Sequence, residues 1–240
     1  MESKLPPALP CVVLSLDIAC FALEGDTLNV LLVKRRADPF AAWWALPGAA
    51  AEAGETLDGA AARILASRTG VTGEYLEQLY TFGDPGRDPR GRTISVAYYA
   101  LLALGDHAAQ AGPGVEAVAW FPVKDMPPLA FDHGAIAVYA YQRLQQKITY
   151  APLVFRVLPE TFTMRDLRLV HEAVLDRPLH PSNFTRQMHA RWDLAPVSGS
   201  RDRRSRRPAR LFRYIGPQSI EGPPQSEGAP AEPDADGEAT

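Results

Sequence analysis

The stretch LPGAAAEAGETLDGAAARILASRTGV (residues 46–71) joins a glycine-rich loop to a run of strong helix formers. Thr56 is a suitable N-cap, because its hydroxyl can accept a hydrogen bond from a free backbone N–H, and Gly70 is a suitable helix stop. We therefore expect one amphipathic helix over residues 55–70.

Strand-like segments flank this helix on both sides. Residues 12–21 (VVLSLDIACF) and 28–36 (LNVLLVKRR) are rich in apolar and β-branched residues, and the Gly25-Asp26 turn between them predicts a hairpin. Three further runs follow the helix, at Tyr75–Phe82, Thr93–Leu104 and Glu116–Pro122. Strands and a helix in this order predict an α/β or α+β sandwich.

The second half of the chain changes to a helical pattern at about residue 131. Apolar residues at helical spacing predict helices over residues 135–148 and 163–176, and Thr163 with Asp166 occupies capping-box positions in the second of them. Pro181 suits the first position of a third helix.

A basic hairpin is expected after this third helix. Phe184 and Met188, four residues apart, would anchor the helix to its neighbours. After Trp192 the sequence predicts two short strands joined by an arginine-rich loop. Two helices followed by a basic hairpin are typical of a winged helix-turn-helix domain.

We accordingly divide the chain into four parts. They are an N-terminal extension (1–10), an α/β domain (11–130), a winged helix-turn-helix domain (131–216) and a disordered acidic tail (217–240).

Composition limits the classes of function. The chain has 240 residues, 46% of them hydrophobic, so it can form two modest domains, and its net charge of −3 does not by itself indicate nucleic acid. That sum hides two opposed blocks: residues 201–213 contain seven arginines, whereas residues 217–240 contain six acidic residues and no basic one.

Location can also be predicted from the sequence. No apolar run approaches the roughly 18 residues of a membrane span, and the start of the chain lacks the apolar core of a signal peptide. Cys11 and Cys20 lie in an apolar stretch without metal-ligand spacing, so we expect both to be buried thiols. These features predict a cytoplasmic protein that has no membrane partner.

Residues 46–71 resemble the Nudix box, G-x5-E-x7-R-E-U-x-E-E-x-G-U, where U is aliphatic. The positions that match are Glu55, Arg63, Leu65, Gly70 and Val71. The first glycine of the pattern falls on Ala49, directly after Gly48. The three glutamates that follow the arginine fall on Ile64, Ser67 and Arg68.

In active members of the family, these three glutamates share one helix face and hold divalent cations against a pyrophosphate. Hard cations such as Mg²⁺ need oxygen ligands, and here one position is aliphatic and another carries a fixed positive charge. The resemblance therefore implies a degenerate Nudix domain with no metal site, no catalytic residues and no cofactor.

The likeness extends over about residues 10–215 and is to the Nudix-related transcriptional regulators (NrtR). It is carried by VLLVKRR…PFAAWWALPG and GDPGRDPRGRTISVAYYALL in the first half, and by PLAFDHGAIAVYAYQRLQQKITY at the junction. FTMRDLRLVHEAVLDRPLHPSNFTRQM and RRPARLFRY resemble the winged-helix signature of that family. The fold implied is a Nudix-type α/β/α sandwich followed by a winged helix-turn-helix domain.

The function implied is that of a ligand-responsive, DNA-binding repressor. It would act on the genes of NAD or related nucleotide or sugar metabolism, sense ADP-ribose or a similar metabolite, and bind a double-stranded operator as a homodimer.

The resemblance also indicates which residues bind the effector. We expect a phosphate-bearing ligand near Arg87 and Arg90, because guanidinium groups make two-point contacts with phosphate oxygens. Secondary candidates are Arg35, Arg36, Phe40 and Trp44, the aromatics by stacking. Equally open is that residues 87–90 form a solvated turn with a local ion pair.

DNA contacts are expected from the third helix and the hairpin loop. The helix presents Ser182, Asn183, Thr185, Arg186 and Gln187, which include side chains able to make two-point contacts with base edges. In the loop, phosphate or minor-groove contacts are expected from Arg203, Arg204, Arg206 and Arg207.

Two other classes of function remain open. The chain could be an active Nudix hydrolase of the ADP-ribose pyrophosphatase kind with an appended module, using Glu52 and Glu55 with another carboxylate such as Asp58. It could also be an RNA or protein binder whose basic hairpin is non-specific.

Overall fold

The structure is a computed structural model that describes residues 11–72, 76–103, 109–202 and 209–217. The expected N-terminal extension lies outside these ranges, as do residues 218–240 of the expected tail and the four hairpin-loop arginines, Arg203, Arg204, Arg206 and Arg207.

Nine strands and four helices make up most of the described chain. The strands are β1 (Val13–Glu24), β2 (Thr27–Arg35), β3 (Trp44–Ala45), β4 (Gly48–Ala50), β5 (Glu77–Phe82), β6 (Thr93–Ala103), β7 (Val115–Pro122), β8 (Trp192–Asp202) and β9 (Ala209–Pro217). The helices are α1 (Leu57–Thr69), α2 (His133–Lys147), α3 (Met164–Leu175) and α4 (Pro181–Arg191), with short 3₁₀ turns η2 (Val123–Asp125) and η3 (Pro152–Arg156).

The first half of the chain forms a mixed sheet. Its main order is β3-β2-β1-β6-β5, with β4 paired to β1 and β7 paired to β2. Strands β1 and β6 are parallel and the other pairs are antiparallel. The expected hairpin is confirmed: Glu24 pairs with Thr27 across a two-residue turn, and Gly25 has a φ of 62°, which a glycine adopts without strain.

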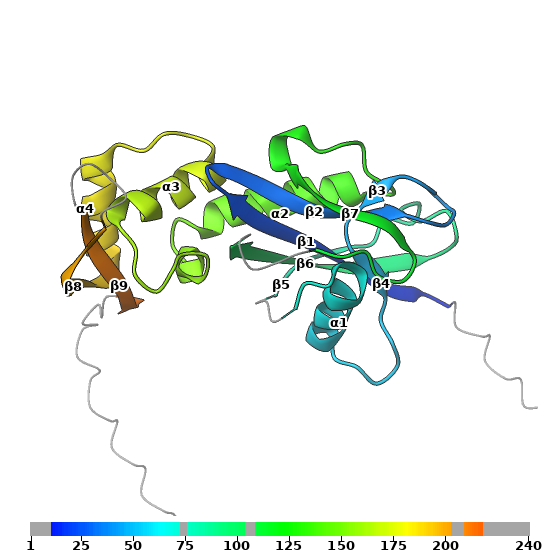
Figure 1. Ribbon diagram of the computed structural model, residues 1–240. Helices are drawn as coiled ribbons and strands as arrows, with labels where there is room; N and C mark the ends of the chain where they lie inside the picture. Colours follow the sequence, from blue (N-terminus) through cyan, green and yellow to red (C-terminus); the bar gives the residue numbers. More distant parts are fainter. Residues whose placement is uncertain (1–10, 73–75, 104–108, 203–208, 218–240) are drawn as a thin grey trace, which may run out of the picture.

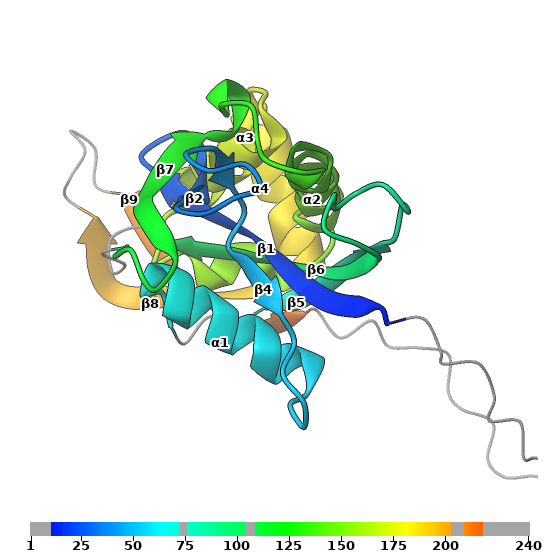
Figure 2. The ribbon, with the colours of Figure 1, turned by 90° about the vertical axis from the view of Figure 1, so that its right-hand side faces the viewer.

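Helices cover both faces of this sheet (Figures 1 and 2). Ile18 and Cys20 of β1 pack with Ile64 of α1, whereas Phe21 packs on the other side with Ile136 of α2. Alternate residues of a strand point to opposite faces, so β1 contributes to both layers. The expected α/β/α sandwich is confirmed, and so is the cap of α1, where the Thr56 hydroxyl accepts from the Gly59 N–H at 3.2 Å.

The second half has the expected helix-turn-helix and wing. The capping box of α3 is present, Pro181 begins α4, and Phe184 and Met188 of α4 are buried. Strands β8 and β9 form an antiparallel ribbon, and Phe162 pairs with Phe212 of β9. These elements gather at one end of the sheet (Figure 1).

Helix α2 belongs to the packing of both halves. Ile136 and Leu144 share one continuous hydrophobic core with residues of β1 and with Leu167 and Val174 of α3. A domain boundary at residues 130/131 remains a prediction; the contact of α2 with the sheet favours a later one, after α2.

The expectation of two buried cysteines is half wrong. Cys20 is buried in the sheet, but Cys11 is exposed, as are Val13 and Leu14 at the start of β1, because this end of the strand extends beyond the packed core. Within the part of the chain that the structure describes, no helix is both long and apolar enough to cross a bilayer.

Candidate ligand cavity and DNA-binding face

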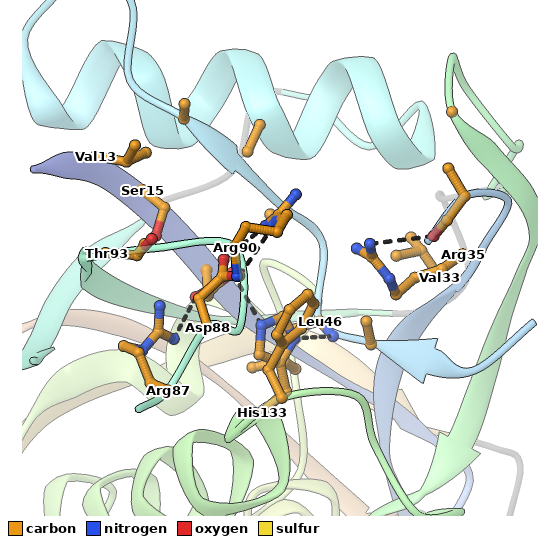
Figure 3. Close-up of a pocket in the computed structure, with 18 of the residues that line it drawn as sticks. Val13, Ser15, Val33, Arg35, Leu46, Arg87, Asp88, Arg90, Thr93 and His133 are labelled. Atoms are coloured by element: carbon orange, nitrogen blue, oxygen red, sulfur yellow. Dashed lines mark hydrogen bonds and ion pairs between the residues drawn. The ribbon is translucent and has the colours of Figure 1, made fainter. Parts of the chain in front are cut away.

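A cavity of about 660 Å³ opens at the end of the sheet where β1 begins and β2 ends (Figure 3). Its walls come from β1, β2, β4, the turn before β6 and the start of α2. The charged residues that line it are Arg35, Arg36, Arg68, Arg87, Arg90 and Arg92, with Asp17, Asp38 and Asp88. Six cations against three anions make the cavity suitable for a negatively charged ligand.

Arg87 is at the base of this cavity, where carboxylates of the protein pair with its guanidinium. Its guanidinium donates to Asp132 at 2.9 and 2.7 Å and to Asp17 at 3.2 Å, and its side chain is 4% exposed. Although burial acts in the opposite direction, these two carboxylates raise the pKa of Arg87. The arginine is therefore a buried tie between β1, its own turn and the start of α2.

Asp17 is the centre of that tie. Besides Arg87, it accepts a hydrogen bond from the Ser95 hydroxyl at 2.6 Å, and its Oδ1 lies 3.4 Å from His133 Nε2. A Cβ on Gly48 would lie 2.2 Å from Asp17 Oδ1, so the close approach of β4 to β1 requires glycine at position 48.

His133 completes the base of the cavity in its neutral form. Burial lowers the pKa of His133, against the effect of Asp17. The Leu46 N–H donates to Nδ1 at 3.0 Å, which places the ring proton on Nε2, toward Asp17. In Figure 3, Arg87, Asp88 and His133 lie near one another, and Arg90 lies above Asp88.

Arg90 is the exposed member of the 87–90 turn. It donates to Asp88 through Nε at 3.0 Å and Nη2 at 2.7 Å, while its side chain is 60% exposed and that of Asp88 only 5%. The local ion pair that the sequence left open is thus present, but it leaves Arg90 accessible in the cavity wall.

An aromatic ring that the sequence analysis did not select lies beside these cations. Phe131 lines the cavity, with the guanidinium carbons of Arg35 and Arg90 at 4.8 and 5.5 Å from its ring centroid. Phe40 packs behind it at 4.7 Å between centroids, and Trp44 packs on Phe121 at 4.8 Å. Neither Phe40 nor Trp44 is among the residues that line the cavity, whereas Arg36 is.

Other lining residues escaped sequence reasoning as well. Arg92 lies within the turn that the sequence analysis quoted, but it was not selected. Asp17 and His133 could not be found from local sequence, because Asp17 contacts Ser95, 78 residues away along the chain, and His133, 116 residues away. The PLAFDHG segment, quoted only as a junction, supplies Phe131 and His133.

The matched carboxylate of the Nudix box has a structural partner. Glu55 accepts from Arg63 at 2.6 and 2.9 Å, and this hydrogen bond, with one from the Glu52 backbone, lowers the pKa of Glu55 to about 2. Over the described residues, no group of three or more His, Cys, Asp or Glu is placed to hold a metal ion.

On α4, the side chains expected to contact DNA lie opposite the buried anchors. Ser182, Asn183, Arg186 and Gln187 are exposed and Thr185 is half-buried, while Phe184 and Met188 are each 4% exposed. Phe184 packs edge-on against His171 of α3, with centroids 5.0 Å apart, and so joins α4 to α3.

Comparison with known proteins gives two adjoining family matches. Residues 14–142 match the model of the NUDIX domain, and residues 154–214 match that of the NrtR DNA-binding winged helix domain. A protein of Acinetobacter baylyi described as the ADPR responsive transcriptional repressor NtrR is 31% identical over 214 residues, which cover 85% of this chain and 83% of that protein. The chain belongs to the NrtR family of Nudix-domain regulators.

Solved structures agree with membership of the NrtR family. Shewanella oneidensis NrtR complexed with a 27mer DNA is 35% identical with a TM-score of 0.71, covering 84% of this chain and 93% of that one. The NUDIX domain of the same NrtR complexed with ADP ribose is 36% identical with a TM-score of 0.55, covering 59% and 95%.

An enzyme also shares the Nudix half. The ADP-ribose pyrophosphatase of Methanocaldococcus jannaschii is 36% identical over 114 residues, which cover 48% of this chain and 66% of the enzyme. The NrtR relatives reported above match both halves of the chain in order, whereas the match to this enzyme covers about half of the chain.

Proposed function

We propose that this chain is a transcriptional repressor that releases or engages operator DNA in response to ADP-ribose or a similar phosphate-bearing metabolite in its Nudix cavity. Such a protein acts where the operator lies, which agrees with the cytoplasmic location expected from the sequence. NAD metabolism is the regulated process we favour, with sugar utilisation as the alternative.

The observation that carries this proposal is a continuous structural connection from the cavity to the helix-turn-helix. Arg87 at the base of the cavity donates two hydrogen bonds to the carboxylate of Asp132, the N-cap residue of α2. At the other end of α2, the Gln145 side-chain amide donates to the Val174 carbonyl of α3 at 3.1 Å. A change in the 87–90 turn can therefore move α2 as a rigid element and tilt α3 with α4.

Within the cavity, we assign the ligand phosphates to Arg90 and Arg36, with Arg35 as a third donor. Arg87 has a structural role, because it is paired with Asp17 and Asp132. We assign the stacking role to Phe131 instead of to Phe40 and Trp44, because Phe131 lines the cavity. Guanidinium groups beside an aromatic face suit a ligand that has both a phosphate and a flat base.

On the DNA side, we assign base contacts to the exposed residues of α4 and phosphate contacts to the hairpin arginines. The residues concerned are Ser182, Asn183, Thr185, Arg186 and Gln187, with Arg203, Arg204, Arg206 and Arg207. Binding as a homodimer to a palindromic site is part of the proposal, since two-fold symmetric regulators read two half-sites.

We further propose that the chain does not hydrolyse its ligand. Support comes from the register of the Nudix box, in which Ile64, Ser67 and Arg68 stand at the three glutamate positions. The second candidate, an active Nudix hydrolase, is favoured only by the likeness of residues in the first half to ADP-ribose pyrophosphatase.

The test is fluorescence anisotropy of the full chain with a labelled duplex covering the region upstream of its own gene, with and without ADP-ribose. We expect ADP-ribose to shift the Kd for DNA at least fivefold, and ribose 5-phosphate or free pentoses to shift it less. An Asn183→Ala, Gln187→Ala double variant should lose DNA affinity and keep ADP-ribose binding, whereas Arg90→Ala should keep DNA affinity and lose the response.

No ADP-ribose binding by calorimetry would contradict the sensor assignment. Hydrolysis is checked separately, by release of AMP from ADP-ribose with Mg²⁺ or Mn²⁺. Turnover above about 1 s⁻¹, an ordinary enzymatic rate, would favour the hydrolase instead.

A further inference from the structure

The face of α1 that would carry the Nudix metal ligands offers no carboxylate to the cavity. Ile64 is fully buried under the sheet, and the Ser67 hydroxyl donates to the Ile64 carbonyl of its own helix at 3.2 Å. Arg68 alone of the three lines the cavity. A divalent cation needs several oxygen ligands, so the residues present do not fit the metal of the family.

Arg68 is held firmly at this place by the fold. It lies in the last turn of α1, where the helix dipole favours a cation, and its Nη1 donates to the Pro113 carbonyl. A Cβ on Gly114 would lie 2.9 Å from that nitrogen, so the glycine leaves room for the guanidinium. The group is thus clamped between α1 and the segment that enters β7.

A second cation is fixed on the same segment. The Arg36 backbone N–H donates to the Gly114 carbonyl at 3.4 Å, and its guanidinium donates to the Val115 carbonyl at 3.3 Å. Arg36 and Arg68 therefore donate to carbonyl groups of the same three residues, 113–115, in the cavity wall.

Two of the three cavity carboxylates are already paired within the protein. Asp17 is paired with Arg87 and bonded to Ser95, and Asp88 is paired with Arg90. Burial is the largest cause that lowers the pKa of Arg35; repulsion from the charges of Arg90 and Arg68 also lowers it, whereas the carboxylates of Asp88 and Asp17 raise it. An anion placed between them would relieve that repulsion.

We propose that Arg68 is the resident cation of this cavity: it binds the diphosphate of the ligand in the place of the divalent metal, so that ligand binding is independent of metal. This inference rests on the proposed function and specifies its ligand class as a diphosphate ester. A guanidinium makes planar two-point contacts with phosphate oxygens. It has no coordinated water to activate as a nucleophile, so the same group that binds the diphosphate leaves it intact.

The experiment is calorimetric titration of the full chain with ADP-ribose in EDTA and again in excess MgCl₂. We expect the two Kd values to agree within about twofold. Arg68→Gln keeps a polar side chain with hydrogen-bond donors but removes the charge, and should raise the Kd in EDTA about tenfold or more, the loss of one charge-assisted contact. Arg68→Glu should raise it further in EDTA.

Arg143→Gln and Arg143→Glu are the matched controls, because Arg143 is an exposed arginine of α2 outside the cavity. Both should leave the Kd within twofold of the unmodified chain. Thermal unfolding of every variant in EDTA identifies any loss of affinity that arises from loss of fold, and the Gln variant decides the result if the Glu variant does not fold.

Outcomes for this inference and for the proposed function can be told apart. Binding that requires Mg²⁺, or a folded Arg68→Gln variant with unchanged affinity in EDTA, would overturn the role of Arg68 and leave the sensor assignment standing. Absence of ADP-ribose binding in both buffers would overturn the proposed function, and this inference with it.

Discussion

Arg87 and Arg90 are three positions apart, and their surroundings give them opposite roles. Replacing Arg87 by Ala would leave Asp17 buried without its counter-charge, so we expect the free energy of unfolding to fall by about 3–5 kcal/mol. Urea denaturation followed by circular dichroism measures this loss. The comparison variant Lys34→Ala removes an ion pair with Glu116 whose two side chains are 30% and 47% exposed, and should cost less than about 1 kcal/mol; equal losses would contradict the assignment of Arg87 as structural.

His171 predicts how stability depends on pH. It is buried between α3 and α4, its Nδ1 lies 2.8 Å from the Leu167 carbonyl, and burial lowers its pKa below the ordinary 6.5. Because the unfolded chain then binds the proton more tightly, the contribution is fully present above pH 6.5 and is lost as pH falls through the folded-state pKa. We expect the free energy of unfolding to decline from pH 7 to pH 5, and to decline less in His171→Leu.

The slope should not vanish in that variant, because burial also lowers the pKa of His133. Urea midpoints at several pH values measure both slopes, and identical slopes for the two proteins would exclude His171 as a contributor.

At the scale of the element, the start of α3 depends on two reciprocal hydrogen bonds. The Asp166 N–H donates to the Thr163 hydroxyl at 3.1 Å, and the Thr163 N–H donates to the Asp166 carboxylate at 2.9 Å. Thr163→Ala removes the first, and we expect the free energy of unfolding, measured by urea denaturation, to fall by about 1 kcal/mol. Thr149→Ala is the comparison, since that exposed hydroxyl donates to the Gln146 carbonyl without capping a helix start, and should stay within about 0.5 kcal/mol.

At the scale of the whole molecule, the tie between Arg87 and Asp132 predicts how the two halves communicate. Asp132→Asn removes the charge that pairs with Arg87, and so weakens the link between the 87–90 turn and α2, without changing a residue that lines the cavity. We expect ADP-ribose to bind this variant with similar affinity but to shift the Kd for DNA by less than it does in the unmodified chain. Paired calorimetry and anisotropy measure the two quantities.

Lys124→Gln is the corresponding control. Lys124 pairs with Asp176 and also joins the first half to α3, but both side chains are exposed, so solvent screens the pair. Its ligand response should match that of the unmodified chain. A response unaltered in Asp132→Asn, or reduced equally in both variants, would count against transmission through α2.

Local sequence patterns were enough to predict the long strands and helices, their order and the family, but not the short strands β3 and β4. Local signals sufficed, because a hairpin turn, a capping box, an N-terminal proline and the register of the Nudix box each lie within a few consecutive residues. Thr56, Gly70, Thr163 and Pro181 therefore occupy the positions expected of them.

The tertiary structure alone decided which arginines face a ligand. In the sequence Arg87 and Arg90 look alike, but folding brings Asp17 and Asp132 to the first and leaves the second accessible. It also turned Trp44 toward Phe121, placed Phe131 in the cavity wall and brought Arg68 against the segment before β7. The physical reason is that burial and pairing of charges depend on contacts between distant parts of the chain, which no local pattern records.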